Sequence, residues 1–417
     1  MKSMLIPIFS LLLSTALLLL GHGLQLTLLP LRAEMEGFSS TEIGLTGSTY
    51  FLGFVIGCLV SPYIVRRVGH IRSFAVLATS YSVIALIFHA TPLFTAWLVL
   101  RFFSGAAISG LYMVIESWLN ERATSENRGT LLSIYTVINL LMITAGQQLL
   151  NIAPISSGLL FAVAAVLFSL AIIPVSLTLS LAPAPIHNVD INLFKIWKLS
   201  NVGVLGSVCS GLTMGAFWTL GPIYAHGIGL EKFHLTLFMS ATVLGGAVFQ
   251  LPLGRLSDHY DRRIVLLAAA FIGGVISILL SIITNTAFWL LLLAFLWGGC
   301  VMTLYAICLA HTTDAAVPED FVVVGSGMLL ITGLFSAIGA PMASLFITYF
   351  GPRGLFIFVA GCLFLLALSI VVRRHVHVIP YQDEIEPFRA IIETSPAVFT
   401  LDPRTETIEE QDPELIT

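Results

Sequence analysis

Twelve apolar stretches, each about twenty residues or longer, constrain this chain more than any other feature. A helix needs about 20 apolar residues to cross the hydrocarbon core of a bilayer. The stretches lie at residues 5–31, 43–65, 73–91, 93–119, 130–150, 156–181, 201–226, 234–256, 264–284, 286–311, 322–349 and 354–374. Only 10% of the residues are charged, which is too few to cover a soluble surface. We therefore predict an all-α integral membrane protein with twelve transmembrane helices.

A turn rich in basic residues occurs twice, 192 residues apart. The first copy runs from Pro62 to Arg72 and the second from Gly254 to Arg263. At the same offset, four residues of the first half recur in the second as Pro30/Pro222, Leu45/Leu237, Ser48/Ser240 and Gly53/Gly245. Duplicated membrane halves are typical of secondary transporters. The repeat predicts two pseudo-symmetric six-helix bundles, residues 1–181 and 201–375, joined by a cytoplasmic linker at 182–200.

The positions of the basic residues predict the orientation. With twelve spans, fifteen lysines and arginines fall on the side of both termini, whereas Arg32, Lys232 and Arg353 fall on the opposite side. Basic loops mark the cytoplasmic side, so we predict a multi-pass protein of the cytoplasmic (inner) membrane with both termini in the cytoplasm. The first stretch is longer than the apolar part of a signal peptide and has no clear cleavage site, so we expect it to remain as a span.

The end of the chain differs in composition from the rest. From Tyr381 onward it has ten acidic residues and two arginines. An acidic segment with few aromatics buries too little apolar surface to fold, so residues 376–417 are predicted to be a disordered cytoplasmic tail. A receptor or scaffold acting through this tail is an alternative to a transporter. Deleting residues 381–417 would separate the two, because a transporter should largely survive the deletion.

Several functions are disfavoured by what the sequence lacks. The five cysteines form no CxxC pair, so neither a metal site nor a disulfide framework is expected. No phosphate-binding loop is present, which argues against an ATP-driven pump. The loops are too short for a catalytic domain. We expect no enzyme activity, no cofactor and no nucleic-acid partner.

Several motifs resemble those of the major facilitator superfamily. The basic turns are similar to its G-x-x-x-D-R-x-G-R-R motif, and Arg101-Phe-Phe-Ser-Gly105 is similar to its R-F-x-x-G. Within the superfamily the chain resembles the YcaD-type branch, through Leu29–Leu31, Tyr112–Ser117, Asn127–Gly129 and Thr303–Tyr305. The resemblance implies that the chain is a transporter that works as a monomer, and it does not indicate the solute.

The basic turns are predicted to gate the cytoplasmic side as well as to anchor the topology. The first turn has Arg66 where the family motif has aspartate, so only Asp258 of the second turn can supply that carboxylate. We expect Asp258→Asn to lower transport without affecting membrane insertion. The predicted gating residues are Arg66, Arg67, Gly69, Gly254, Asp258, Arg262 and Arg263.

Arg101 and Glu116 are charged residues inside the fourth span. Burying either at the bilayer centre costs roughly 2.5–3.5 kcal/mol. They are about 22 Å apart along a helix and cannot pair directly. Glu116 is either a proton-carrying carboxyl or a residue that ties the span to Arg122 or Arg128. Arg101 either tunes the site or packs between helices, and the family resemblance favours a role in proton coupling.

Polar and aromatic residues of other spans are predicted to line a substrate path. The candidates are His22, Gln25, Tyr112, Asn139, Gln147, Trp218, Tyr224, Gln250 and Tyr305. Each alone is more typical of helix packing than of contact with a solute. Together they favour a neutral or weakly anionic, partly apolar organic solute. We expect secondary active transport by alternating access, coupled to protons and in the direction of export, with an uncoupled facilitator as the alternative.

Overall fold

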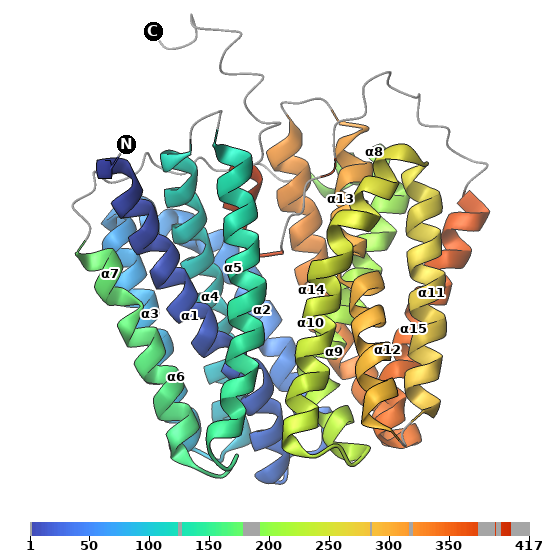
Figure 1. Cartoon of the computed structure of the whole chain (residues 1–417), viewed down its shortest axis with the longest axis horizontal. Coiled ribbons are helices and arrows are strands. Elements are labelled where there is room, and N and C mark those ends of the chain that lie inside the picture. Colours follow the sequence, from blue (N-terminus) through green and yellow to red (C-terminus); the bar gives the residue numbers. More distant parts are fainter. Residues whose placement is uncertain are drawn as a thin grey trace, which may run out of the picture.

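The computed structural model describes residues 2–123, 127–177, 192–283, 286–316, 320–373, 388 and 393–401, with residues 2–7 and 401 described by their backbone alone. Within these ranges no residue lies in a strand. Figure 1 shows the helices standing side by side in two groups, one from each half of the chain.

The first group holds α1 (Lys2–Met35), α2 (Ser40–Val68), α3 (His70–Ala90), α4 (Phe94–Arg122), α5 (Arg128–Gln148), α6 (Gly158–Leu170) and α7 (Ile172–Ser176). The second holds α9 (Asn201–Gly227), α10 (Lys232–His259), α11 (Arg262–Ile282), α12 (Ala287–Val301), α13 (Leu304–Thr313), α14 (Phe321–Phe350) and α15 (Gly354–Arg373). The short α8 (Leu193–Leu199) precedes α9 and covers part of the linker predicted at 182–200. Residues 182–191 of that linker lie outside the described residues.

The prediction of twelve membrane helices in two bundles is confirmed. Eleven helical stretches of the described chain are long and apolar enough to cross a membrane, and the last, Phe321–Arg373, contains both α14 and α15. Large apolar side chains such as Phe103, Val166 and Leu365 are exposed. Exposed apolar surface on this scale requires lipid as the solvent.

Two of the predicted spans are interrupted helices. The stretch at 156–181 is divided between α6 and α7, and Pro174 in α7 has no amide hydrogen to donate to the carbonyl of Leu170. The stretch at 286–311 is divided between α12 and α13 at Met302. There the hydroxyl of Thr303 donates to the carbonyls of Gly299 and Cys300, a bond that competes with the helix ladder and bends it.

The repeated glycines have equivalent positions in the two bundles. A Cβ at Gly53 of α2 would lie 1.9 Å from the carbonyl oxygen of Phe102 in α4, and one at Gly245 of α10 would lie 1.8 Å from that of Phe295 in α12. Glycine lets two membrane helices approach to backbone contact. The duplication therefore preserves the packing of the second helix of each bundle against the fourth.

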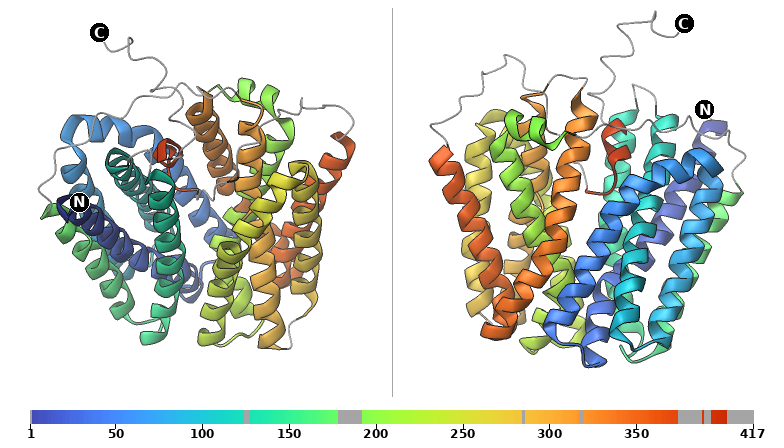
Figure 2. Two further views of the ribbon diagram at one scale, coloured as in Figure 1. Left: turned by 45° about the horizontal axis from the view of Figure 1, so that its top comes forward. Right: turned by 180° about the vertical axis from the view of Figure 1, so that it is seen from behind.

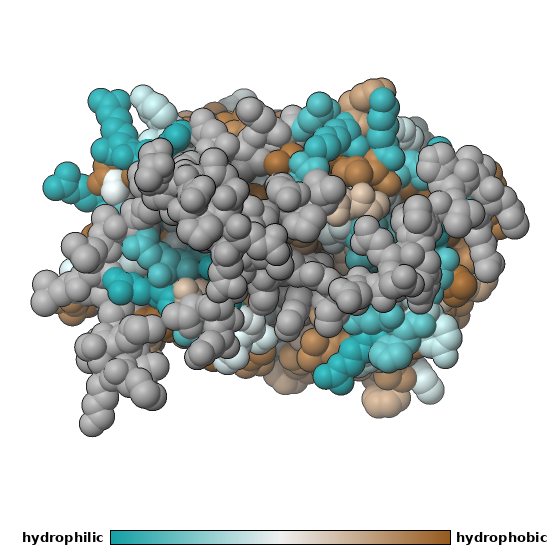
Figure 3. All heavy atoms as spheres, turned by 90° about the horizontal axis from the view of Figure 1, so that it is seen from above, coloured by the Kyte–Doolittle hydropathy of each residue, from teal (hydrophilic) through white to brown (hydrophobic). Residues whose placement is uncertain are grey.

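The end of the molecule at which α1 starts and α15 ends is called the upper end, as drawn in Figure 1, and the opposite end is called the lower end. Hydrophilic side chains of described residues are spread over the upper end (Figure 3). Gly69, with φ of +86°, forms the turn from α2 to α3 at this end.

Part of the tail predicted to be disordered has a defined position. Residues 396–401 form a short 3-10 helix, η4 (Pro396–Leu401), which packs against α4, α5 and α14. Figure 2 shows this element between the two bundles at the upper end. The difference from the expectation arises because Val398 and Phe399 are fully buried there. The remaining tail, except Phe388 and Glu393–Ser395, lies outside the described residues.

Candidate functional site

A cavity of about 210 Å³ lies between the two bundles. This is far more than the roughly 10–15 Å³ that one water needs. Helices α1, α2, α4 and α5 of the first bundle and α9, α10, α13 and α14 of the second contribute to its walls. A site between the two halves can be exposed to one membrane side or the other as the halves rock.

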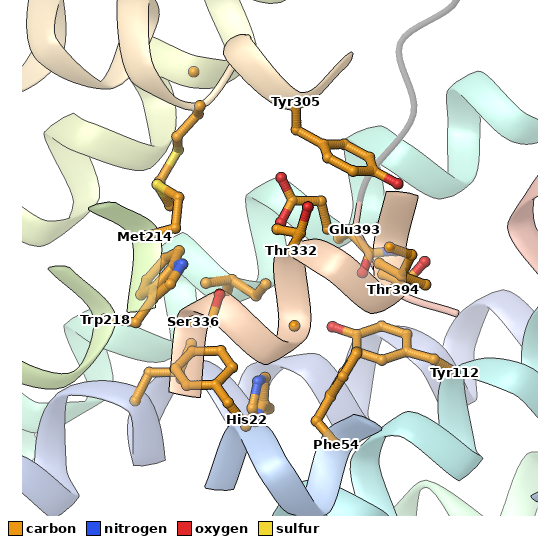
Figure 4. Close-up of a pocket in the computed structure, with 18 of the residues that line it drawn as sticks. His22, Phe54, Tyr112, Met214, Trp218, Tyr305, Thr332, Ser336, Glu393 and Thr394 are labelled. Carbon is orange, nitrogen blue, oxygen red and sulfur yellow. The ribbon is translucent and has the colours of Figure 1, made fainter. Parts of the chain in front are cut away.

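The wall of the cavity is aromatic and aliphatic, with a few polar groups. Tyr50, Phe51, Phe54, Tyr112, Trp218 and Tyr305 provide the rings. Polar groups come from His22, Asn139, Gln250, Thr332 and Ser336. Figure 4 shows Glu393 and Thr394 of the tail between Tyr305 and Tyr112, on the other side of the cavity from His22. Such a wall suits a partly apolar organic molecule held by a few hydrogen bonds.

Arg101 lies behind the cavity wall. It is 5% exposed, and its guanidinium carbon lies 4.7 Å from the ring centroid of Tyr50, which lines the cavity. Its Nε has no hydrogen-bond partner among the described residues. The ring of His22 stacks on the same tyrosine, with its centroid 6.4 Å from that of Tyr50. The Nδ1 of His22 lies 2.8 Å from Tyr81 Oη. The arginine is therefore connected to the cavity through Tyr50.

Glu116 is completely buried in the upper half of α4. The Tyr135 hydroxyl of α5 donates to its Oε1 at 2.7 Å, and the hydroxyls of Thr394 and Ser395 donate to Oε1 and Oε2. Thr394 also lines the cavity. One residue therefore separates the carboxyl of Glu116 from the cavity.

The two basic turns differ in their surroundings. Arg66 and Arg67 of the first turn are exposed. In the second, Arg262 is buried and lies 3.2 Å from Asp258 and 2.5 Å from Asp314. Asp258 also accepts the backbone amide of Phe388, at 2.8 Å and 3.0 Å to its two oxygens.

Two other residues of the second turn, Gly254 and Arg263, make contacts of their own. Gly254 lies under the ring of Phe388. Arg263 is buried, and its amide is capped by Asp261 at the start of α11. The second turn is thus part of a charged network, as a gate would require.

At the lower end, side chains join the bundles directly. Ser240 of α10 accepts from Gln148 of α5 at 2.7 Å and donates to Gln147 at 3.1 Å. Its repeat partner Ser48 in α2 donates to the carbonyl of Ala337 in α14. Asn151 donates to Thr236 at 2.9 Å, and the ammonium of Lys232 donates to the carbonyl of Ala153 at 2.9 Å. These contacts close the lower end around the cavity.

Six of the predicted path residues line the cavity: His22, Tyr112, Asn139, Trp218, Gln250 and Tyr305. Three lie elsewhere. Gln25 is buried next to the cavity-lining turn of α1, without a hydrogen-bond partner for its amide among the described residues. Gln147 belongs to the lower-end contacts. Tyr224 packs against Phe238 and Phe356 in the second bundle, and its hydroxyl donates to the carbonyl of Leu280.

Sequence reasoning did not single out Tyr50, Tyr135 or the tail residues Glu393, Thr394 and Ser395. A signal for the tail is present. Residues 388–401 contain two charged residues, Arg389 and Glu393, and six large apolar ones, whereas the sixteen residues that follow contain seven charges. An apolar segment inside an acidic tail indicates a buried position.

Two helical bundles around a central cavity define the class of alternating-access membrane transporters. The chain matches the Major Facilitator Superfamily over residues 11–195 and 203–401, and it belongs to this family. It is 27% identical over 375 residues to an uncharacterized MFS-type transporter, YcaD, of Escherichia fergusonii, covering 88% of this chain and 95% of that protein. The YcaD transporter of Escherichia coli K12 is 26% identical over 377 residues, with the same coverage.

Solved structures share the fold. The nucleoside transporter NupG superposes with a TM-score of 0.76 at 14% identity, covering 90% of this chain and 100% of that one. A bacterial homologue of the human lysosomal transporter Spinster, in an inward-facing and occupied conformation, gives a TM-score of 0.72 at 12% identity, with 89% and 96% covered. The fucose:proton symporter FucP of E. coli gives 0.56 at 16% identity, with 89% and 99% covered.

Proposed function

We propose that this protein is a secondary active transporter that exports a small, partly apolar organic solute across the cytoplasmic membrane in exchange for protons. The observation that carries the proposal is the cavity between the bundles, with cross-bundle hydrogen bonds at its lower end and a lining of aromatic, aliphatic and polar groups in which Glu393 is the one acidic residue among those that the structure describes. Alternating access requires a central site of this kind.

The charge distribution supports an upper end that faces the cytoplasm. Among the described residues, the basic side chains at the upper end are Arg66, Arg67, Arg72, Arg122, Arg128, Lys195, Lys198, Arg255, Arg262, Arg263 and Arg373. Those at the lower end are Arg32, Lys232 and Arg353. This bias is the one that directs membrane insertion. A monomer supplies both halves of the site.

The buried carboxyl of Glu116 supports proton coupling. A carboxyl in this position is stable when it is protonated or when hydrogen-bond donors surround it, as Tyr135, Thr394 and Ser395 do. Proteins of the same fold include a nucleoside transporter and a fucose:proton symporter. The fold therefore accommodates both organic solutes and protons. The proposed direction of transport, export, is the one expected from the sequence.

An uncoupled facilitator is the competing function, because Glu116 and Tyr135 would then serve to hold α4 against α5. The two functions differ in their dependence on pH. A coupled exporter loses its response to an imposed proton gradient when Glu116 becomes glutamine, whereas a facilitator has no such response to lose.

The test compares the metabolites of cells and spent medium from a null strain, the wild type and a Glu116→Gln strain. We expect one solute to accumulate inside both the null and the Glu116→Gln cells and to be released by the wild type. Glu121→Gln, which removes an exposed carboxyl from the same helix, is the matched control and should behave as the wild type. Retention in the null strain alone would leave an uncoupled transporter, and the absence of any difference would contradict transport.

A further inference from the structure

The end of the chain enters the space between the bundles, and this position has consequences for the transport path. The segment consists of residues 393–401, preceded by Phe388. Thr394, Ser395, Ala397, Val398 and Phe399 are all buried, as deeply as residues in the helix cores. The average composition of the acidic tail does not predict this burial, whereas the apolar composition of residues 388–401 does.

Two glycines accommodate the phenylalanine rings of this segment. A Cβ at Gly254 of α10 would lie 2.0 Å from the ring of Phe388, and one at Gly325 of α14 would lie 2.6 Å from the ring of Phe399. Any larger residue would displace the rings. The second bundle therefore has two fitted positions for the tail.

Polar groups of both bundles are paired with the segment. In the first bundle, Glu116 accepts from the hydroxyls of Thr394 and Ser395. In the second, Ser210 of α9 donates to Glu393 at 3.4 Å, and Asp258 accepts from the amide of Phe388. The segment thus bridges the two bundles through the predicted proton site and the predicted gate.

The segment also forms part of the cavity wall. Glu393 and Thr394 line the cavity, and η4 lies beyond them toward the upper end (Figures 2 and 4). The lower end is closed by the contacts of α5 with α10. The cavity thus has direct contacts between the bundles on its lower side and the segment on its upper side.

We propose that Phe388 and residues 393–401 form an inhibitory segment that occupies the cytoplasmic entrance of the transport path and must leave before solute or protons can reach the cavity and Glu116. This inference rests on the proposed transport function, whose upper end is cytoplasmic. The segment acts as an intramolecular ligand. The hydroxyls of Thr394 and Ser395 donate to Glu116, and the rings of Phe388 and Phe399 pack against Gly254 and Gly325. Release removes the segment's donors from Glu116 and Asp258 together, and leaves Glu116 with Tyr135 and Asp258 with Arg262.

The test measures access to the cavity without knowledge of the solute. A single cysteine replaces Ser336, a cavity-lining residue of α14, in a chain whose five native cysteines are serines. A membrane-impermeant maleimide is applied to the upper end of the protein in inside-out vesicles. Lys198→Cys, at an exposed position of α8, measures the rate without any barrier.

Three chains carrying Ser336→Cys are compared. We expect deletion of residues 388–417 to raise the labelling rate about tenfold or more, because access scales with the fraction of molecules in which the path is open. Deletion of 402–417, which leaves the segment intact, should not change the rate. A synthetic peptide of residues 388–401, added to the shortened chain, should restore protection. Labelling that is equal in all three chains would overturn the proposal.

A point variant guards against loss of folding in the shortened chain. Thr394→Ala with Ser395→Ala removes the two hydroxyls of the segment that donate to Glu116, keeps the hydrogen bonds of Glu116 with Tyr135 and with the backbone of Val398, and changes no residue of either bundle. We expect it to raise the labelling rate above that of the full chain and below that of the deletion. A rate equal to that of the full chain would mean that these hydroxyls do not hold the segment.

A measurement of export distinguishes an inhibitory segment from a segment that the transport site requires for its structure. Export of the solute identified with the null strain should be faster in the chain lacking 388–417 than in the full chain. Faster labelling with abolished export would mean that the segment is a required part of the site, and would overturn inhibition. If neither chain exports any solute, the transport function fails while the labelling result still decides whether the segment closes the path.

Discussion

The two ends of the interface between the bundles are closed by different means. At the lower end, helices touch helices: Ser240 bonds to Gln147 and Gln148, and Gly47 of α2 lets Thr219 of α9 approach closely. At the upper end, the chain's own tail lies between α4 and α14. Contacts between helices can break only when the bundles rock, whereas a terminal segment can leave while the bundles stay in place. Access to the cavity at the upper end can therefore change through the tail segment without movement of one bundle against the other.

The largest expected effect comes from a clash at the lower end. A Cβ at Gly47 would lie 2.2 Å from Thr219 Oγ1, so Gly47→Leu should destabilise the closed lower end by about 1–3 kcal/mol. Labelling of Ser336→Cys from the lower side should then rise by roughly one to two orders of magnitude. Gly361→Leu, at a glycine of α15 with open space around it, is the control. An unchanged rate would mean that α2 and α9 do not form the barrier.

The next effect is a pH dependence confined to the upper end. Burial raises the pKa of the Glu393 carboxyl from 4.5 to about 7, against the effect of the Ser210 hydroxyl. Because the inserted segment holds a proton that the released segment loses, insertion is favoured at low pH and weakens as the pH rises from about 4.5 to 7. Tyr305 and Cys308 are neutral neighbours of this carboxyl.

Labelling of Ser336→Cys from the upper side should therefore rise between about pH 5 and pH 8 more than labelling of Lys198→Cys does. In Glu393→Gln the labelling of Ser336→Cys should rise with pH no more than that of Lys198→Cys, since release of the segment then releases no proton. A pH response that survives in Glu393→Gln would assign it to another group. The lower end has no part in this response, so labelling from that side should follow the pH dependence of the thiol alone.

Asp258 pairs with Arg262 of the predicted gate and with Phe388 of the tail. We expect Asp258→Asn to have an effect of intermediate size on export. In a chain lacking 388–417, Asp258→Asn removes the pairing with Arg262, and export should fall about tenfold, as for the loss of a charged hydrogen bond. In the full chain the fall should be smaller, because the amide of Phe388 loses one of its two acceptor oxygens and the negative charge of the other, so that the segment leaves more often. The difference between the two backgrounds is a double-mutant cycle. Equal falls would mean that Asp258 does not hold the tail.

The smallest effect concerns the repeated serines. Ser240→Ala breaks two bonds across the lower end and Ser48→Ala breaks one, each worth about 0.5–1.5 kcal/mol. We expect labelling from the lower side to rise a few-fold for Ser240→Ala and less for Ser48→Ala. Ser133→Ala removes a hydroxyl that bonds within its own helix on an exposed face, and it should change nothing. A larger rise in labelling for Ser48→Ala than for Ser240→Ala would contradict this ranking of the two serines.

The sequence predicts the fold well because the helix pattern is a property of local composition. Apolar length alone determines the membrane spans, and the offset that pairs Ser48 with Ser240 also indicates two related bundles. The interruptions are harder to predict: Pro174 marks one, but Met302 is apolar and carries no such mark. One interruption lies near a proline that lacks an amide hydrogen and the other near a side-chain hydroxyl that bonds to backbone carbonyls, and a hydropathy pattern records neither.

The site is predicted less completely, because facing a cavity and facing a core look alike in a sequence. Trp218 and Tyr224 are both aromatic residues of α9, six positions apart, yet the first lines the cavity and the second packs against Phe356. The tail is the clearest case. Its order depends on Glu116, Gly254 and Gly325, residues remote in the chain, and a composition average over 376–417 hides the apolar stretch that fits them.

The place of the inhibitory segment at the end of the chain also matters during biosynthesis. Residues 388–401 follow α15 in the chain and are translated after it, so the helices of both bundles are synthesised before Thr394 and Ser395 exist to donate to Glu116. A nascent or prematurely terminated chain carries this buried carboxyl with Tyr135 as its partner on α5. Closure of the upper end by the proposed segment therefore comes after the synthesis of both bundles.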